Sequence, residues 1–371
     1  MPRGDGTRVV HAGLPPRGQG EPFLPGPTFA APYHLVGNPE DSPYVYGRYG
    51  NPSWSGLERA IEELEGGPAV SFGSGMAAVA AVMLPLLRPA DVLVIPEDGY
   101  PAVRSLATGH LAERGVEVRQ VPASLHPDHE LLAGAKLVWL ESPSNPGLEV
   151  CDIRAVVKRV HDEGGLVAVD NTLATPLGQH PLELGADYSV ASDSKHLTGH
   201  GDLILGHVAC GDPDRIAGLV HWRTETGSIP GPFEAWLAHR SIATLDVRLE
   251  RQCATALALA ERLVFRSDLT RVRYPGLPAD PAHQLARHQM SRFGSVISFE
   301  LETRDRAERF LAECRLVAES TSFGSVHSMA ERRARWPGSG VSEGLIRLSV
   351  GCESPDDVIR DVEGALDASP A

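Results

Sequence analysis

The stretch Asp187-Tyr188-Ser189-Val190-Ala191-Ser192-Asp193-Ser194-Lys195-His196-Leu197 decides how the rest of the chain is interpreted. Residues 187–191 predict a strand, because β-branched and aromatic residues lie between turn formers. Ser192, Ser194 and Lys195 then follow the strand's end, where hydroxyls can bind a phosphate while an amine condenses with an aldehyde. The alternative is a surface lysine, since most lysines are solvated. The pattern indicates a covalent cofactor site that needs support from elsewhere in the chain.

The length and composition limit the class of protein. A chain of 371 residues exceeds one typical core, which predicts two domains, with a possible third segment. With 42% apolar and 22% charged residues, the composition is that of a globular enzyme. Asp and Glu (48) outnumber Lys and Arg (34), and the net charge of −14 argues against nucleic-acid binding. The basic cluster Arg332, Arg333 and Arg335 is the exception, and we expect it to be solvated.

Several features speak against a membrane, secreted or metal-binding protein. There is no apolar window of about 18 residues and no apolar signal-peptide core at the N-terminus. The pair His196 and His200 is separated by Gly199 and lacks a nearby third ligand, so we predict no metal site. Five scattered cysteines without a Cys-x-x-Cys motif predict reduced thiols in a cytoplasmic protein: Cys151, Cys210, Cys253, Cys314 and Cys352.

The chain divides into three predicted segments. Residues 1–45 are rich in Pro and Gly and show no helical period, which predicts an extended arm lying on another surface. Residues 46–225 form the larger predicted domain, which begins with a helix that has Ser53 or Ser55 near its N-cap and ends at Gly66. Residues 226–371 predict a smaller α+β domain, with a long amphipathic stretch at 233–265.

The larger domain alternates strands with helices. Short apolar strands separated by helices predict an α/β fold with a mostly parallel sheet covered on both faces. Ligands of such sheets bind beyond the carboxyl ends of the strands. The predicted strands lie at 69–72, 92–95, 116–121, 137–140, 166–169 and 188–191.

The turn Gly73-Ser74-Gly75-Met76 opens a predicted helix and supports two interpretations. The free N–H groups and the dipole of a helix N-terminus form an anion site, which suits a phosphate. Gly73-x-Gly75-x-x-Ala78 also matches a dinucleotide fingerprint, and Glu97 follows the next strand where a ribose-binding acid belongs. A nicotinamide dehydrogenase is therefore the alternative, but it gives Lys195 no role.

Three further polar or aromatic residues follow strands. Asp170 precedes Asn171-Thr172 and could pair with a protonated pyridine nitrogen, or could cap the next helix. Asn145 lies in Ser144-Asn145-Pro146 and could be a functional amide or only a turn residue. Tyr100 could stack on a cofactor ring or pack internally.

The combination favours one reading of these separate signals. A phosphate cradle, an aromatic ring, an amide, a carboxylate and an amine follow one another in chain order, each after its own strand. From about residue 7 to the C-terminus the chain resembles the Cys/Met-metabolism pyridoxal-phosphate enzymes, which have fold type I. The resemblance rests on the motifs YGRYGNPS, SFGSGMAA, ESPSNP, VDNTLATP, SDSKHLTGHGD and LIRLSVGCE.

The resemblance implies a role for each candidate residue. Lys195 would bind the cofactor aldehyde, Asp170 would pair with the pyridine nitrogen, and Tyr100 would stack on the ring. Arg347 would hold the substrate α-carboxylate, assisted by Asn145 and Ser322. The remaining implied contacts to the cofactor come from Ser74, Gly75, Met76, Asn145, Thr172, Ser192 and Ser194, and from Tyr46 and Arg48 of a neighbouring subunit. The family's usual assembly implies a homotetramer, a dimer of active dimers.

The resemblance also implies a carbon–sulfur lyase, with cystathionine γ-lyase the preferred activity. That enzyme converts cystathionine to cysteine, 2-oxobutanoate and ammonia by α,γ-elimination, with Lys195 moving the α-proton and Tyr100 acting at sulfur. Methionine γ-lyase and cystathionine γ-synthase, which catalyses γ-replacement, stay open as alternatives. A non-catalytic cofactor-binding or scaffold protein is a more distant one.

Three departures from the family pattern bear on the substrate. Pro101-Ala102-Val103 follows the tyrosine without the cysteine that marks the usual methionine γ-lyases, which favours cystathionine. His327 stands where synthases and many lyases have a glutamate, which removes an anion that could hold a distal substrate ammonium. Residues 331–336 lack the family's Met-Thr-His segment, so the resemblance leaves the outer wall of the pocket undefined.

Overall fold

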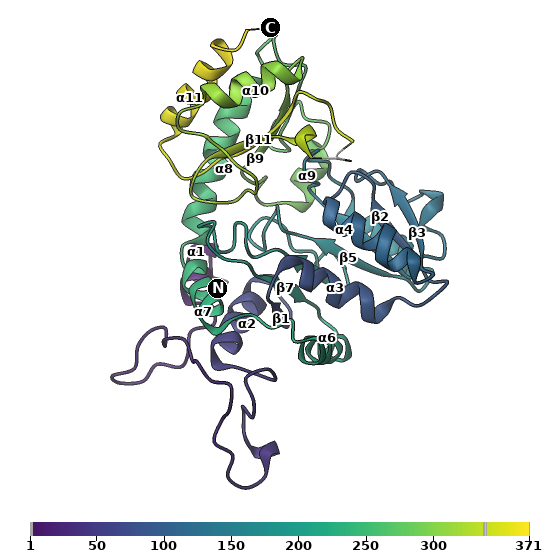
Figure 1. Ribbon diagram of the computed structural model, residues 1–371, viewed down its shortest axis with the longest axis vertical. Helices are drawn as coiled ribbons and strands as arrows, with labels where there is room; N and C mark the ends of the chain where they lie inside the picture. Colours follow the sequence, from purple (N-terminus) through teal and green to yellow (C-terminus); the bar gives the residue numbers. More distant parts are fainter. Residues whose placement is uncertain (1–2, 337, 339, 371) are drawn as a thin grey trace.

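The computed structural model describes residues 3–336, 338 and 340–370, arranged around two β-sheets (Figure 1). Positions 1, 2, 337, 339 and 371 of the predicted segments lie outside the described residues. The smaller sheet and helices α8 to α11 occupy the top of the view, and the larger sheet lies below them. The arm protrudes at the bottom.

The larger sheet has seven strands in the order β1-β7-β6-β5-β4-β2-β3. All neighbouring pairs from β6 to β3 are parallel, and β7 runs antiparallel to both β1 and β6. The predicted mostly parallel α/β sheet is confirmed. The strands are β1 (Ala69–Phe72), β2 (Val92–Pro96), β3 (Glu117–Val121), β4 (Leu137–Glu141), β5 (Leu166–Asp170), β6 (Tyr188–Ala191) and β7 (Gly206–Ala209).

Helices bury both faces of this sheet, which explains why its strands are continuously apolar. One core lies beneath α3 and contains Phe72, Leu93 and Trp139. The core on the other face contains Val138 and Val169. The helices of this part are α2 (Pro52–Glu65), α3 (Gly75–Leu86), α4 (Pro101–Ser105) continued by η2 (Leu106–Leu111), η3 (Glu130–Leu132), α5 (Ile153–His161) and α6 (Pro213–Thr226).

The smaller sheet has the order β10-β11-β12-β9-β8, with all pairs antiparallel except β10 with β11. Its core packs against the long helix α8. The strands are β8 (Arg271–Arg273), β9 (Val296–Glu300), β10 (Ala318–Glu319), β11 (Met329–Arg332) and β12 (Leu345–Ser349). The helices are α7 (Pro232–Ile242), α8 (Leu245–Leu263), α9 (His283–Gln289), α10 (Arg304–Glu313), η4 (Arg333–Arg335) and α11 (Pro355–Asp367).

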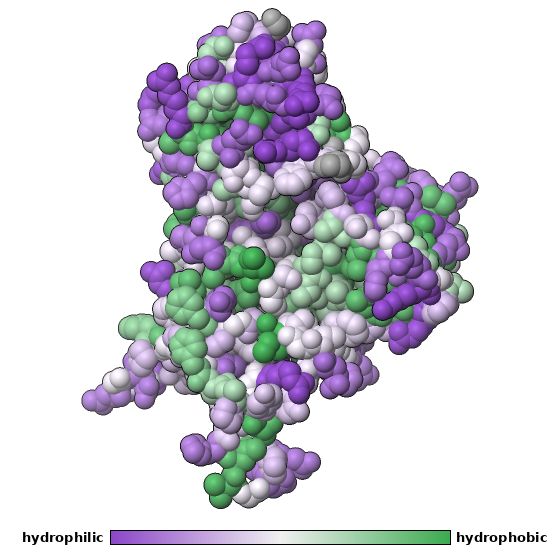
Figure 2. Space-filling view, viewed as in Figure 1, coloured by the Kyte–Doolittle hydropathy of each residue, from purple (hydrophilic) through white to green (hydrophobic). Residues whose placement is uncertain are grey.

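The N-terminal segment is only partly the extended arm that we predicted. Helix α1 (Asp5–His11) packs on α2 and α8 of the same chain and buries Val9 and Ala12. The seven-residue helix presents too few apolar residues for its period to stand out in the sequence. After residue 14 the chain is extended apart from the short turn η1 (Pro39–Asp41), and Figure 2 shows apolar residues along this protruding part.

The structure refines two local predictions. The N-cap of α2 is Asn51, whose side chain accepts a hydrogen bond from Ser53 N, because Pro52 occupies the first helical position. The stretch at 233–265 is two helices, α7 and α8, which separate at Ala243-Thr244. The predicted end of α2 at Gly66 is confirmed by its left-handed φ of 78°.

Candidate active site

A cavity of about 270 Å³ opens where the carboxyl ends of β4, β5 and β6 face the start of α3. Because these strands are parallel, their carboxyl ends meet at one edge of the sheet. The predicted residues that line this cavity are Ser74, Gly75, Met76, Tyr100, Asn145, Asp170, Thr172, Ser192, Ser194 and Lys195. Residues that are up to 121 positions apart are thus brought to one wall.

Lys195 lines the cavity and contacts the segment that precedes β11 of the smaller sheet. Its Nζ donates a hydrogen bond to Ser322 Oγ at 2.8 Å and lies 5.4 Å from the centre of the Phe323 ring. Burial and then the nearby charge of Arg347 lower the pKa of Lys195, while Asp170 opposes them. A lowered pKa increases the fraction of neutral amine, which is the form that attacks an aldehyde.

Asp170 ends β5 and faces the same cavity. Its Oδ1 accepts a hydrogen bond from Thr172 N at 3.0 Å, and Oδ2 has no hydrogen-bond partner among the described residues. Burial raises the pKa of Asp170, while Thr172 and Lys195 oppose that shift. The carboxylate therefore retains an acceptor oxygen for a cationic N–H group inside the cavity.

The start of α3 forms the anion-binding end of the cavity. Ser74 is its N-cap and accepts a hydrogen bond from Ala77 N at 3.0 Å, which leaves the N–H groups of Gly75 and Met76 free for a ligand. A Cβ on Gly75 would lie 2.7 Å from Ser192 Cβ, so this close approach requires glycine. Ser194 also lines the cavity, but its hydroxyl already donates to Leu205 O at 3.2 Å.

Glu141 is a buried carboxylate that we did not select from the sequence. It ends β4 and lies directly opposite Asp170 in the parallel register. Its oxygens accept hydrogen bonds from Tyr100 N and Asn145 N, both at 2.7 Å. Burial and then Asp170 raise the pKa of Glu141 to about 8. The argument from strand ends that selected Asp170 applies equally to Glu141 and could have found it.

Two predicted substrate-binding residues, Arg347 and Ser322, reach the site from the part of the chain that contains the smaller sheet. Arg347 lies on β12 and is 3% exposed. Its Nη1 donates to Asn145 Oδ1 at 2.8 Å, and its Nη2 donates to Ser322 O at 2.7 Å. Ser322 has a positive φ of 78° and links Arg347 to Lys195 through its two oxygens. Arg347 does not itself line the cavity, which it approaches through Asn145 and Phe323.

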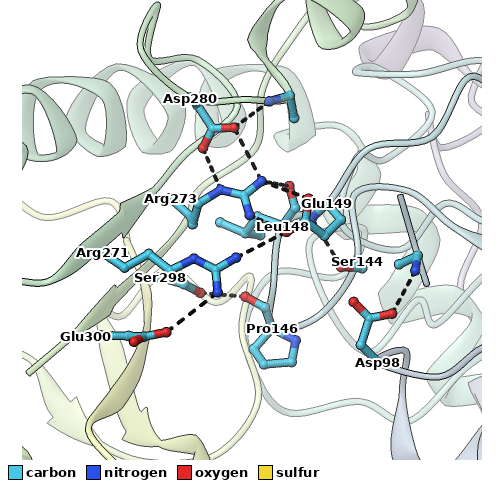
Figure 3. A network of polar contacts seen from close by, with 12 residues as sticks. Asp98, Ser144, Pro146, Leu148, Glu149, Arg271, Arg273, Asp280, Ser298 and Glu300 are labelled. Atoms are coloured by element: carbon cyan, nitrogen blue, oxygen red, sulfur yellow. Dashed lines mark hydrogen bonds and ion pairs between the residues drawn. The ribbon is translucent and has the colours of Figure 1, made fainter. Parts of the chain in front are cut away.

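Residues of the smaller sheet form hydrogen bonds and ion pairs with the loop that carries Asn145 (Figure 3). Ser298 Oγ on β9 donates to Pro146 O at 2.6 Å. Arg273 on β8 pairs with both Glu149 and Asp280, and the more exposed Arg271 also contacts Glu149. These contacts fix the position of the loop relative to β12.

Tyr46 and Arg48 do not line the cavity of their own chain. Tyr46 is 43% exposed, and Arg48 Nη1 donates to Thr224 O at 2.6 Å. Their contribution to a neighbouring subunit, which the resemblance implies, stays a prediction.

The sheet order excludes the arrangement that a dinucleotide site requires. In such a fold the ribose-binding acid follows the strand next to the glycine turn. Here β7, β6, β5 and β4 separate β1 from β2, which leads to Glu97, and β1 is an edge strand. The nicotinamide alternative therefore fails on topology, which the fingerprint cannot reveal.

The structure corrects the expectation for the basic cluster at residues 332–335. Arg332 and Arg333 are buried and paired with Glu343 and Glu331, so only Arg335 of the predicted solvated cluster is exposed. His327 is exposed and does not line the cavity, and its effect on the substrate stays a prediction. Among the described residues no group of three or more His, Cys, Asp or Glu side chains could hold a metal ion.

The residues present fit pyridoxal phosphate. The cavity provides an amine, an anion site at a helix N-terminus and a carboxylate with a free oxygen, and the cofactor has an aldehyde, a phosphate and a ring nitrogen to match them.

Within the part of the chain that the structure describes, no helix is long and apolar enough to span a bilayer.

Comparisons with known proteins agree with this geometry. The chain is 56% identical over 369 residues to a Streptomyces coelicolor protein named "Putative cystathionine gamma-lyase", covering 98% of this chain and 94% of that protein. It is 36% identical to the L-methionine gamma-lyase of Pseudomonas putida, covering 99% and 98% of the two chains. Cystathionine gamma synthase from Xanthomonas oryzae, crystallised with cystathionine, has a TM-score of 0.94 at 32% identity, covering 100% and 99%.

The family description "Cys/Met metabolism PLP-dependent enzyme" matches residues 7–367, nearly the whole chain. Its members act on sulfur amino acids with pyridoxal phosphate, and the relatives above include carbon–sulfur lyases. The fold, the cavity and these similarities lead to one conclusion: the chain is a member of the Cys/Met-metabolism family of pyridoxal-phosphate-dependent enzymes.

Proposed function

We propose that this protein is a cystathionine γ-lyase, which converts cystathionine to cysteine, 2-oxobutanoate and ammonia. The observation that carries the substrate choice is the 56% identity, over 98% of the chain, to the Streptomyces coelicolor relative with that name. The absence of a cysteine at Pro101-Ala102-Val103 also supports it, because the usual methionine γ-lyases have one there.

The side chains around the cavity suit the steps of an α,γ-elimination. When bound, pyridoxal phosphate supplies an aldehyde and a ring that withdraws electrons from Cα of the amino acid. Asp170 would keep the ring nitrogen protonated through its free Oδ2. Gly75 N–H and Met76 N–H, with the hydroxyls of Ser74 and Ser192, would hold the phosphate.

Proton transfer would fall to Lys195 and Tyr100. The lowered pKa of Lys195 suits an amine that removes the α-proton and then a proton from Cβ. Tyr100, half exposed at the cavity mouth, would protonate the departing sulfur, so that the Cγ–S bond breaks and cysteine leaves as a thiol. Arg347, Asn145 and Ser322 would orient the α-carboxylate.

The assembly belongs to the same proposal. We propose a homotetramer of two active dimers, in which Tyr46 and Arg48 complete the partner's phosphate site. The exposed apolar side chains of the arm support this assembly, because Phe23, Phe29 and Val36 are 87%, 72% and 99% exposed in the single chain. A cytoplasmic location, and the domain limits at residues 45 and 225, stay predictions.

A second candidate is methionine γ-lyase. Two crystal structures from Micromonospora echinospora, described as a methionine gamma lyase and as a cystathione gamma lyase, both have TM-scores of 0.91 with this chain. Similarity of fold therefore does not distinguish the two substrates.

A substrate panel with product identification tests the proposal. The holoenzyme is incubated with cystathionine, with methionine, and with O-succinylhomoserine plus cysteine. We expect cysteine and 2-oxobutanoate from cystathionine to form fastest. Faster methanethiol release from methionine, net cystathionine synthesis, or pyruvate and homocysteine from cystathionine would overturn it in favour of the other activities. Lys195→Ala should lose the visible cofactor band that borohydride shifts in the native enzyme.

A further inference from the structure

The guanidinium of Arg347 is already occupied at the position where a substrate carboxylate would bind. Glu331 on β11 lies directly opposite Arg347 in the antiparallel register, and its Oε1 accepts a hydrogen bond from Arg347 Nη2 at 2.5 Å. Ser322 O accepts the second hydrogen of Nη2 at 2.7 Å. A carboxylate can form a bidentate pair with a guanidinium either through Nε and Nη2 or through Nη1 and Nη2. Both arrangements therefore require Nη2. Neither edge is free while these contacts persist.

Glu331 has other partners that can retain it. Its Oε1 also accepts a hydrogen bond from Arg333 Nη1 at 2.5 Å, and its Oε2 accepts one from Trp336 Nε1 at 2.9 Å. Glu331 is completely buried, and Arg333 and Arg347 are 6% and 3% exposed. Arg347 Nε and Arg333 Nε are both buried without a partner among the described residues, so the cluster has two donors that no protein group satisfies. Of these, Arg347 Nε lies on an edge that a carboxylate can bridge together with Nη2.

The charges of these three residues leave room for one anion. Two guanidinium groups and one carboxylate carry a net charge of +1, and an uncompensated buried charge is costly. One substrate α-carboxylate would neutralise the group. Glu331 and Arg333 lie in residues 331–336, where the chain departs from the family motif.

We infer that Glu331 is a displaceable counter-ion of Arg347 and a specificity-determining residue. The α-carboxylate of the substrate replaces Glu331 on Arg347 Nη2 and also satisfies Nε, while Arg333 and Trp336 retain Glu331. This inference rests on the proposed function, which assigns the α-carboxylate to Arg347. A neutral carboxamide cannot displace Glu331 in this way, so the exchange selects for a free carboxylate.

The test measures how strongly the holoenzyme prefers a carboxylate over a carboxamide. L-norleucine has no sulfur leaving group, so its binding can be followed by the visible absorption of the cofactor without γ-elimination. L-norleucinamide is the matched neutral ligand. The measured quantity is the ratio of the two dissociation constants, amide over acid, in the native enzyme and in each variant.

Two variants should move this ratio in opposite directions. Glu331→Gln removes the competing charge, so the ratio should rise roughly fivefold, because one charge at contact distance is lost. Arg333→Gln leaves Glu331 without its second cation, so the ratio should fall by roughly the same factor. Arg333→Lys retains the charge and should stay close to the native ratio. Trp336 fluorescence, taken as the difference from Trp336→Phe, should change when norleucine binds.

The outcomes separate the inference from the proposed function. If Glu331→Gln lowers the ratio or leaves it unchanged in a folded, cofactor-loaded protein, Glu331 only supports the structure and the inference is wrong. If Glu331→Gln does not fold, the Arg333 variants decide, and equal ratios in Arg333→Gln and native enzyme overturn the inference. If Arg347→Leu, which removes the cation, leaves the ratio unchanged, the assignment of Arg347 in the proposed function is wrong as well.

Discussion

Two buried ionic clusters flank the site, and they differ in charge and in access. Beneath the lysine loop, His207 on β7 pairs with Asp193 through Nδ1 at 2.6 Å and with Glu65 through Nε2 at 3.1 Å. All three side chains are completely buried, none lines the cavity, and the group carries a net charge of −1. The cluster around Arg347 carries +1 and reaches the cavity wall through Asn145.

The comparison shows that access to the cavity decides whether a buried ionic cluster stabilises the fold or binds a ligand. The His207 cluster is closed, so it can only hold the loop of Lys195 and the strand β7 together. Both clusters contain buried polar atoms without a partner among the described residues, Glu65 Oε2 and Asp193 Oδ2 in the first and Arg347 Nε in the second. Only the Arg347 cluster adjoins the cavity, so its excess charge is available to a ligand. Loss of a charge should therefore affect mainly stability in the first cluster and mainly binding in the second.

The largest expected effect is the loss of stability in His207→Leu. Removing the imidazolium leaves Asp193 and Glu65 buried without a cation, which should lower the free energy of unfolding by about 3–5 kcal/mol. Denaturant titration of native and variant protein measures this change. A loss below about 1 kcal/mol would mean that the cluster does not stabilise the fold.

Arg347→Leu should impair catalysis more than it impairs stability. Losing the guanidinium that binds the α-carboxylate of the substrate should reduce kcat/KM for cystathionine by about 100-fold or more. Its unfolding free energy should change less than in His207→Leu, because Glu331 retains Arg333 and Trp336. Steady-state kinetics and denaturant titration on the same preparation test both parts. An equal loss of stability in the two variants would remove the distinction between the clusters.

The His207 cluster should also make stability depend on alkaline pH. Burial alone would lower the pKa of His207, but Asp193 and Glu65 outweigh it and raise that pKa to about 10. The folded protein then retains a proton that the unfolded chain releases near its ordinary pKa. The stabilisation is complete below about pH 6.5 and should decline by up to about 1.4 kcal/mol per pH unit as pH rises toward 10.

Unfolding free energies at several pH values between 6 and 10 check this slope. Other groups also titrate in this range, so the relevant quantity is the difference between the native protein and His207→Leu. That difference should shrink as pH rises. A difference that stays constant would show that His207 is neutral in the folded protein.

The smallest effect is expected for Arg271→Gln, which serves as the exposed reference. Arg271 contacts Glu149 and Glu300 in Figure 3, but its side chain is 46% exposed. Exposed ion pairs contribute about 0–1 kcal/mol, so stability should change by less than about 1 kcal/mol. The buried neighbour Arg273, which also contacts Glu149, gives the matched variant Arg273→Gln, for which a clearly larger loss is expected.

Reasoning from strand ends found much of the cavity in advance. Lys195, Asp170 and Asn145 could be placed because parallel strands bring their carboxyl ends to one edge, whatever the order of the strands. The same reasoning passed over Glu141, although it ends β4. It also admitted Glu97, because only the strand order β1-β7-β6-β5-β4-β2-β3 separates β2 from the glycine turn.

The sequence by itself determined the alternating strands and helices, the amine, the carboxylate and the helix N-terminus, because these depend on local patterns and on the polarity of each strand. The register of β11 against β12 was decided only in three dimensions, and with it the pairing of Glu331 with Arg347. A basic run such as Arg332-Arg333 looks solvated in one dimension, because the sequence does not show that it is buried or that Arg332 pairs with Glu308 and Glu343. Long-range electrostatic pairing depends on which strands become neighbours, and no local periodicity encodes that choice.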